Sequence, residues 1–300
     1  MEYREWYAYG VRELEEAGIE EAALDARLLL EYVCHTRRND LLAHGDREVG
    51  EEEGKVYMDG IARRRKHEPL QYITGEQDFM GLTFLVDRNV LVPRQDTEIL
   101  VEEAMRFLHD GMDVLDMCTG SGCILLSLLH YSNGCHGLGV DISRDALAVA
   151  ECNRIRLQKK ERAGNLWQDG CNGGNGIEET EPACRFLESD LFEKVSGRFD
   201  LIVSNPPYIP ADELSGLMEE VGRYEPRLAL DGKEDGLSFY RRIVAQAGDY
   251  LRGGGALFFE VGCGQAEAVK GMMEKEGYRD ITVVKDYAGI DRVVYGWKWK

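Results

Sequence analysis

The sequence lacks the features that would place it in a membrane or outside the cell. No apolar run approaches the roughly 20 residues that a bilayer-spanning helix requires, and the first residues show no basic-then-apolar signal pattern. The eight cysteines form no Cys-x-x-Cys pair, and none has a histidine at a zinc-finger interval. We therefore expect a cytoplasmic protein with reduced thiols and no metal site. The alternative for two of the thiols is a bridge from Cys171 to Cys184 across a glycine-rich stretch.

Basic residues are also scarce. Lysine and arginine total 36 against 55 acidic residues, and the net charge of -19 would repel the phosphates of nucleic acids unless basic side chains cluster. One basic run exists, from Arg63 to Lys66, but on an expected helix such a run favours a solvated face over a docking site for an acidic partner. We expect no nucleic-acid partner.

The spacing of apolar residues divides the chain into three parts. Residues 1–70 alternate apolar and charged residues at helical spacing, which predicts a small helical domain. Residues 71–93 contain a predicted β-hairpin, running from Tyr72 to Val86, which would act as a linker. Residues 94–300 begin with a helix near Asp96 and then repeat strand, glycine turn and helix, which predicts an α/β domain.

The α/β part predicts a mainly parallel sheet. The expected strands are 114–117, 136–140, 185–188, 199–204 and 256–260, each followed by helical or loop sequence. Two further strands, 281–285 and 292–297, are too close together for a crossover helix and should pair antiparallel. The polar segment 158–182 is expected to be a mobile surface loop.

A glycine turn follows the first of these strands, at Cys118-Thr119-Gly120-Ser121-Gly122. Glycine lets the backbone approach a ligand closely, and the N–H groups of the following helix would face that ligand. A dinucleotide fingerprint needs a third glycine three residues later, where this chain has Leu125. A pyrophosphate is therefore disfavoured, whereas S-adenosylmethionine has no phosphate and needs no such cradle.

Acidic residues end the next two strands. Asp141 lies about 20 residues after the glycine turn, where a carboxylate can accept hydrogen bonds from both ribose hydroxyls; the alternative is an N-cap for the helix that starts near Ser143. Asp190 could meet an adenine amino group or could be a simple cap. Because ligands of open α/β sheets bind at the carboxyl ends of the strands, these residues predict a nucleoside-bearing ligand.

The fourth strand end carries Asn205-Pro206-Pro207-Tyr208. The two prolines fix their own φ angles and Pro206 makes Asn205 extended, so the segment is stiff, and the Asn205 amide offers an acceptor and two donors. Such a frame suits a planar amide or amine nitrogen. The alternative, a proline-rich turn with a stacking tyrosine, does not explain why four successive strand ends carry ligand-binding side chains.

Several motifs in combination resemble the release factor glutamine methyltransferases, the HemK-like protein-(glutamine-N5) methyltransferases. They are 69–75 with 79–82, 90–94 with Thr97-Glu98, 116–124, 199–210, 225–230, 235–237 and 240–241. The resemblance covers about residue 68 to the C-terminus, and the antiparallel end of the predicted sheet also resembles the methyltransferase sheet. One departure is Leu191, which stands where the family often has an aromatic residue that stacks on adenine.

The resemblance implies a Rossmann-like class I methyltransferase domain over 94–300, with residues 1–70 recognising the substrate. It implies methyl transfer from S-adenosylmethionine to the side-chain nitrogen of the glutamine in the Gly-Gly-Gln motif of peptide chain release factors. The donor would meet the turn from Cys118 to Gly122 together with Asp141, Asp190, Leu191 and Asn205. Asn205, Pro206 and Tyr208 would be catalytic, and Pro207 would complete the substrate site.

Two other functions fit parts of the sequence. An adenine-N6 DNA methyltransferase can use the same Asn-Pro-Pro-Tyr set to hold the amine of a flipped base. The net charge of -19 and the N-terminal motifs count against it. A non-catalytic module that binds the donor or a release factor would bind without turnover, and the intact segment 205–208 favours an enzyme instead.

Overall fold

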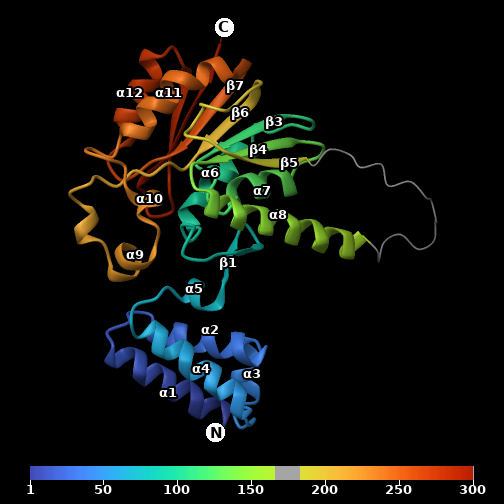
Figure 1. Cartoon of the computed structure of the whole chain (residues 1–300), viewed down its shortest axis with the longest axis vertical. Coiled ribbons are helices and arrows are strands. Elements are labelled where there is room, and N and C mark those ends of the chain that lie inside the picture. The colour runs from blue at the N-terminus through green and yellow to red at the C-terminus, as the bar shows by residue number, and fades with distance from the viewer. Residues whose placement is uncertain (166–182, 300) are drawn as a thin grey trace, which may run out of the picture. The chain divides into compact units, whose positions relative to one another are not determined.

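The computed structural model describes residues 1–165 and 183–299, and the chain in it divides into two units (Figure 1). The first unit contains Met1–Glu76 and Leu217–Tyr224, and the second contains Gln77–Gly216 and Glu225–Lys300. The short segment Leu217–Tyr224, which follows the Asn-Pro-Pro-Tyr motif, thus belongs to the first unit although it is far in sequence from the rest of that unit. The two units are described separately.

The first unit is helical. Its helices are α1 (Tyr3–Glu16), α2 (Ala22–Cys34), α3 (Arg38–Ala43), α4 (Glu51–Arg64), α5 (Leu70–Thr74) and α9 (Glu219–Tyr224). The apolar faces of α1, α2, α4 and α5 enclose a core that includes Leu14, Leu30 and Tyr57. Close packing requires a glycine at Gly10, because a Cβ there would lie 2.0 Å from the Tyr57 hydroxyl oxygen.

The basic run from Arg63 to Lys66 is a solvated face only in part, because Arg65 and Lys66 are exposed whereas Arg64 is not. Arg64 is buried, and its guanidinium pairs with Asp25 at 2.7 Å and with Glu220 of α9 at 2.9 Å. Helical periodicity turns the middle of the run inward, and the buried cation is tolerated because two carboxylates satisfy it. This pairing links α4 to the segment that returns from the second unit of the chain.

The predicted hairpin of the linker begins later than expected. Residues 70–74 form α5, and the strands are β1 (Glu76–Phe79) and β2 (Leu82–Leu85). Pro69 at the N-cap and Gly75, at φ 76°, bracket the short helix, which is the usual placement of proline before a helix and glycine after it. The prediction of strand at Tyr72 missed this pair of signals.

The second unit is built on a seven-stranded sheet, as predicted. Its strands are β3 (Asp113–Met117), β4 (His136–Asp141), β5 (Cys184–Glu188), β6 (Phe199–Ser204), β7 (Leu251–Glu260), β8 (Arg279–Lys285) and β9 (Asp291–Lys298). They lie in the order β5-β4-β3-β6-β7-β9-β8, with β9 antiparallel to both of its neighbours and all other pairs parallel. The order reverses between β3 and β6, which is the switch point where open sheets bind ligands.

Helices cover both faces of this sheet (Figure 1). One core contains residues of α6 (Gln95–Met105), α7 (Cys123–His130) and α8 (Arg144–Asn165), and the other contains residues of α11 (Ser238–Tyr250) and α12 (Ala266–Lys275). Alternate strand residues feed the two cores: Val114 and Val203 belong to the first, and Leu115 and Ile202 to the second. Between β6 and α11 lie a 3-10 turn (Leu214–Gly216) and α10 (Arg227–Leu230).

Part of the segment 158–182 is helical rather than loop. α8 continues to Asn165, and residues 166–182 lie outside the described residues. Polar side chains do not stop a helix when no glycine or proline interrupts it, and the first glycine of this stretch is Gly164. Across the described ranges no helix is long and apolar enough to cross a membrane.

The cysteines within the described ranges are all free thiols, and Cys184 is one of them. The other end of the alternative bridge, Cys171, lies outside the described residues.

Candidate active site

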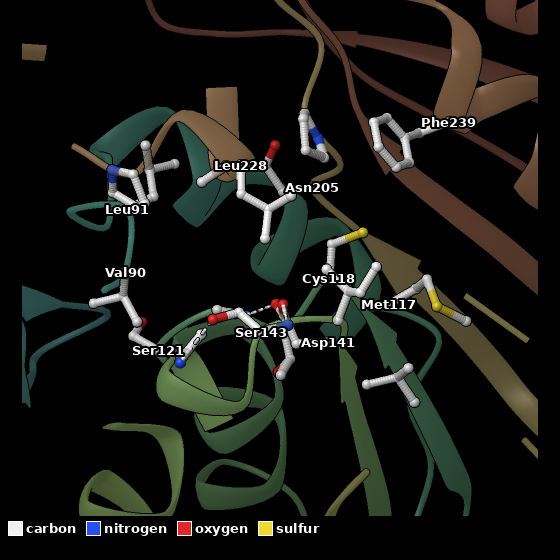
Figure 2. Close-up of a pocket in the computed structure, with 18 of the residues that line it drawn as sticks. Val90, Leu91, Met117, Cys118, Ser121, Asp141, Ser143, Asn205, Leu228 and Phe239 are labelled. Atoms are coloured by element: carbon white, nitrogen blue, oxygen red, sulfur yellow. Dashed lines mark hydrogen bonds between the residues drawn. The ribbon is translucent and has the colours of Figure 1, made fainter. Parts of the chain in front are cut away.

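A cavity of about 380 Å³ opens at the carboxyl ends of β3, β4, β5 and β6 (Figure 2). This volume lies within the range of small-molecule sites. The predicted residues that line it are Cys118, Thr119, Gly120, Ser121, Asp141, Asp190, Leu191, Asn205 and Pro207. The lining does not include Gly122, Pro206 or Tyr208. The sheet therefore brings residues from four strand ends around one space.

The glycine turn forms the floor of this cavity. Cys118 has a φ of 63°, Thr119 N–H donates to the Val140 carbonyl at 3.0 Å, and Gly122, at φ 78°, starts α7. A Cβ on Gly120 would meet nothing within 4 Å, so open space lies above its backbone. A ligand can approach the main chain closely there, and this is the role that the sequence predicts for this glycine.

A buried carboxylate supports the turn from beneath. The Thr119 hydroxyl donates to Asp116 Oδ2 at 2.6 Å, and Asp116 is fully buried. Burial raises the pKa of Asp116 to about 7, and the hydrogen bond from Thr119 opposes that shift. Asp116 thus braces the turn by a hydrogen bond between residues three apart.

Asp141 is held by main-chain groups on both of its oxygens. Oδ2 accepts the Gly120 N–H at 2.9 Å and Oδ1 accepts the Ser143 N–H at 2.9 Å (Figure 2). The N-cap of α8 is Ser143, whose Oγ accepts the Ala146 N–H at 3.2 Å, so the alternative role of Asp141 as the cap is wrong. Each carboxylate oxygen keeps a further lone pair for a ligand hydroxyl.

Asp190 forms an ion pair and does not act as a helix cap. Its Oδ1 pairs with Arg242 of α11 at 2.9 Å. The neighbouring Leu191 is buried at a φ of 49°, and Phe239, also from α11, lines the same cavity. The cavity therefore has an aromatic ring from Phe239, although the residue at position 191, after β5, is the aliphatic Leu191.

The Asn205 amide is tied to two residues that sequence reasoning did not select. Asn205 Nδ2 donates to Thr97 Oγ1 at 3.3 Å, and the Thr97 hydroxyl donates to Glu260 Oε2 at 2.6 Å. Burial raises the pKa of Glu260 to about 7, and the hydrogen bond from Thr97 and the charge of Arg292 oppose the shift.

The rest of the Asn-Pro-Pro-Tyr segment is clamped from behind. The Tyr208 hydroxyl lies 3.4 Å from Glu260 Oε1, and Gln265 Nε2 donates to the Tyr208 carbonyl at 2.9 Å. Gly232 and Gly236 let a second chain segment pass against Tyr208: a Cβ on Gly236 would lie 2.3 Å from the Tyr208 carbonyl oxygen. The segment is held by packing on its far side, and Asn205 and Pro207 remain at the cavity.

The remaining wall comes from segments that precede β3 and follow β6. Figure 2 shows Val90, Leu91 and Leu228 facing Ser121 and Ser143 across the cavity. Apolar side chains on this wall exclude water from one side of the space, while the opposite side carries the polar strand ends.

Sequence signals for the missed residues existed. Glu260 is the acidic end of the strand expected at 256–260, so the reasoning applied to Asp141 and Asp190 extends to it. Thr97 lies in the motif Thr97-Glu98, but no sequence pattern pairs it with Glu260, 163 residues away. Phe239 lies between the motifs 235–237 and 240–241, and no local signal marks it.

Comparisons with known proteins identify the family of this chain. Residues 5–75 match the family model described as the PrmC N-terminal domain. The chain is 43% identical to a release factor glutamine methyltransferase of Geobacter sulfurreducens, and the match covers 94% of this chain and 92% of that protein. It is 40% identical to a release factor glutamine methyltransferase of Clostridium acetobutylicum, and this match covers 96% of this chain and 94% of that protein. A methyltransferase crystal structure from Pyrococcus furiosus shares the fold, with a TM-score of 0.50, 18% identity and coverage of 73% of this chain and 90% of that chain. With these identities over nearly its whole length, the chain belongs to the release factor glutamine methyltransferases, which use S-adenosylmethionine.

Proposed function

We propose that this protein transfers a methyl group from S-adenosylmethionine to the side-chain amide nitrogen of the glutamine in the Gly-Gly-Gln motif of peptide chain release factors. The observation that carries the proposal is the Asn205 amide at the edge of the donor cavity, held from behind by Thr97. The names of the relatives support the class of substrate. We propose residues 94–300 as the catalytic domain and residues 1–70 as a contributor to release-factor recognition.

The cavity suits the donor in its chemistry. Asp141 presents a fixed carboxylate for ribose hydroxyls, the backbone at Gly120 is open to close approach, and Leu191 and Phe239 provide apolar surface for a purine. Asp190 keeps an oxygen for an amino group beside its pairing with Arg242. When bound, S-adenosylmethionine supplies an electrophilic methyl group on a sulfonium sulfur.

The acceptor segment must overcome the low nucleophilicity of an amide nitrogen, whose lone pair is delocalised into its carbonyl. Asn205 Oδ1 and the Pro206 carbonyl accept the two N–H bonds of the glutamine amide, which holds the nitrogen in line with the methyl group. Tyr208, which is partly exposed but lies outside the lining of the donor cavity, would pack on the amide plane from the side of the substrate. Positioning of this kind can lower a barrier by several kcal/mol without a metal or a strong base.

Proton loss needs no dedicated base in this mechanism. The N–C bond would form as the S–CH3 bond of the sulfonium breaks, which leaves S-adenosylhomocysteine. The methylated nitrogen would then be cationic and acidic, and it would lose one proton to water as the product leaves the acceptor oxygens of Asn205 and Pro206. The apolar wall formed by Val90, Leu91 and Leu228 keeps the surroundings poor in water, which favours a reaction in which charge disperses.

A release factor fits the charge of the protein better than DNA does. The net charge of -19 opposes the phosphates of a duplex, so we propose no nucleic-acid substrate. A substrate of the translation apparatus also implies that the protein acts in the cytoplasm.

The test is mass spectrometry of the Gly-Gly-Gln peptide after incubation of the protein with a release factor and S-adenosylmethionine. We expect the mass gain of one methylene unit, localised to that glutamine. A parallel reaction with duplex DNA should incorporate no label from radioactive donor. An unmodified glutamine while the donor is bound would refute the proposal, and label in the DNA would favour the adenine-N6 alternative.

A further inference from the structure

Three side chains from distant segments form a hydrogen-bonded chain at the acceptor segment, and two of them, Thr97 and Asn205, line the cavity. It runs from Asn205 Nδ2 to Thr97 Oγ1 at 3.3 Å, and from the Thr97 hydroxyl to Glu260 Oε2 at 2.6 Å. Thr97 is 3% exposed and Glu260 is 2% exposed, so bulk water does not compete for these bonds. The three residues come from α6, from the end of β6 and from the end of β7.

The charge of the last member sets the direction of every bond in the chain. An ionised carboxylate only accepts, so the Thr97 hydroxyl donates its single proton to Glu260 and offers only lone pairs to Asn205. Of the two ends of the Asn205 amide, only Nδ2 can donate to those lone pairs. Nδ2 therefore faces Thr97, and Oδ1 occupies the opposite end of the amide.

We propose that Glu260, acting through Thr97, is a positioning residue that fixes which end of the Asn205 amide is presented to the acceptor nitrogen. This inference rests on the proposed function, in which Asn205 Oδ1 accepts an N–H bond of the substrate glutamine. An asparagine amide has nearly the same shape in its two orientations, and the reversed one would set an N–H group against the substrate N–H. The buried carboxylate removes that reversed state.

Glu260 also supports the other end of the acceptor segment. Its Oε1 lies 3.4 Å from the Tyr208 hydroxyl, and its own carbonyl accepts the Tyr240 hydroxyl at 2.9 Å. One strand end thus holds Asn205 through Thr97 and contacts Tyr208 directly. A networked carboxylate of this kind orders more than one partner.

Protonation of Glu260 would remove the fixed donor-to-acceptor direction of the hydrogen bonds that join Asn205, Thr97 and Glu260. A neutral carboxyl can donate to Thr97, whose hydroxyl can then turn its proton toward Asn205 and accommodate Oδ1. Burial raises the pKa of Glu260 to about 7, so this change falls in an accessible pH range. The titratable and charged groups that act on Glu260 or respond to its charge are Asp96, Cys123, Tyr208, Tyr240 and Arg292.

Steady-state kinetics on a release factor, with the full-length protein, test the role of Thr97. We expect Thr97→Val to lower kcat about 10- to 100-fold, which is less than the roughly 10²- to 10³-fold effect of removing a hydrogen bond made directly to the reacting group. The KM for the release factor and the Kd for S-adenosylmethionine should change by less than about threefold. Thr97→Ser restores a hydroxyl and should recover most of the lost kcat. The matched control is Thr83→Val on β2, outside the cavity lining.

The pH profile of kcat tests Glu260. In the unmodified protein kcat should fall as the pH drops through about 7, because the neutral carboxyl no longer fixes the orientation of the Thr97 hydroxyl and of the Asn205 amide. Glu260→Gln should have a low kcat without this acid limb, whereas the exposed Glu267→Gln should keep it.

The outcomes separate this inference from the proposed function. If the unmodified protein does not methylate the glutamine, the proposed function fails. If it does, but Thr97→Val keeps its kcat, or Thr97→Ser is as slow as Thr97→Val, or the acid limb persists in Glu260→Gln, the positioning role is wrong. Should thermal melting show that Thr97→Val is unfolded, the pH profile of Glu260→Gln decides.

Discussion

The donor side and the acceptor side of the cavity are built differently. On the donor side, Thr119 bonds to Asp116 three residues away, and the turn from Cys118 to Gly122 joins one strand directly to one helix. On the acceptor side, the bonds that hold Asn205 join residues 108 and 163 positions apart. A local turn with glycine at fixed places makes one half, and long-range side-chain contacts make the other.

This difference predicts different sensitivities. The donor side spreads its proposed ligand contacts over several groups, among them the Asp141 carboxylate and the open backbone at Gly120, so one substitution there should weaken binding without abolishing catalysis. The acceptor side relies on individual side chains, and no neighbouring group can make the same hydrogen bonds when one of them is removed. Substitutions on the two sides should therefore separate the binding of the donor from the rate of transfer.

The largest expected effect is that of Asn205→Ala. Loss of the Oδ1 acceptor should lower kcat about 10³-fold, or about 4 kcal/mol of transition-state stabilisation. The Kd for S-adenosylmethionine, measured by calorimetry, should stay within a few-fold. Radiolabel transfer to a release factor gives the rate, and the exposed Asn133→Ala is the control. Near-normal transfer by a variant that binds the donor would remove Asn205 from the reaction.

The next effect concerns stability and pH at Glu260. Its pKa is raised from 4.5 to about 7 in the folded protein, so the folded state holds this proton more tightly than the unfolded state. The stability gained is complete below pH 4.5 and is lost as the pH rises to about 7, amounting to about 3 kcal/mol. Denaturant unfolding at pH 5 and 8 should show this loss in the unmodified protein and in Glu267→Gln. Asp116, whose pKa burial also raises to about 7, adds a loss of its own over the same pH range, so the loss in Glu260→Gln should be smaller than in Glu267→Gln but not zero. Equal losses in the two variants would show that Glu260 does not contribute.

On the donor side, Asp141→Asn should weaken binding of S-adenosylmethionine about 10- to 100-fold, because one acceptor oxygen of a charged group becomes a donor. At saturating donor, kcat should stay within a few-fold of the unmodified value. Asp145→Asn, exposed in the first turn of α8, is the control. A large fall in kcat at saturating donor would contradict the division between the two sides.

The smallest effect compares two glycines of the second unit with similar backbone angles. Gly236 (φ 73°) and Gly264 (φ 78°) both pay about 1 kcal/mol for a Cβ in the left-handed region. Only Gly236→Ala also collides, with the Tyr208 carbonyl oxygen at 2.3 Å, and it should cost roughly 1 to 2 kcal/mol more in unfolding free energy. Gly236→Ala should lower kcat as well. Equal losses of unfolding free energy in the two variants would mean that the segment packed against Tyr208 moves aside without a measurable penalty.

Most of the sheet could be predicted from the sequence, because buried strands and glycine turns are local patterns. The strand predicted at 199–204 has those bounds, and the last two strands pair antiparallel as the short connection requires. The errors arose where a local pattern was overridden or misread. α5 replaced the start of the hairpin, α8 extended into the polar segment, and Arg64 turned inward to meet Asp25.

The sequence by itself determined the donor turn, the acidic strand ends and the stiff Asn-Pro-Pro-Tyr segment, since each is specified by neighbouring residues and by the period of the strands. Only the tertiary structure decided what stands behind Asn205. Thr97, Asn205 and Glu260 lie on three different elements, and their meeting depends on the order β3-β6-β7 and on the packing of α6 against β7. No local pattern contains that information, because hydrogen bonds between distant side chains form only once the whole sheet has been assembled.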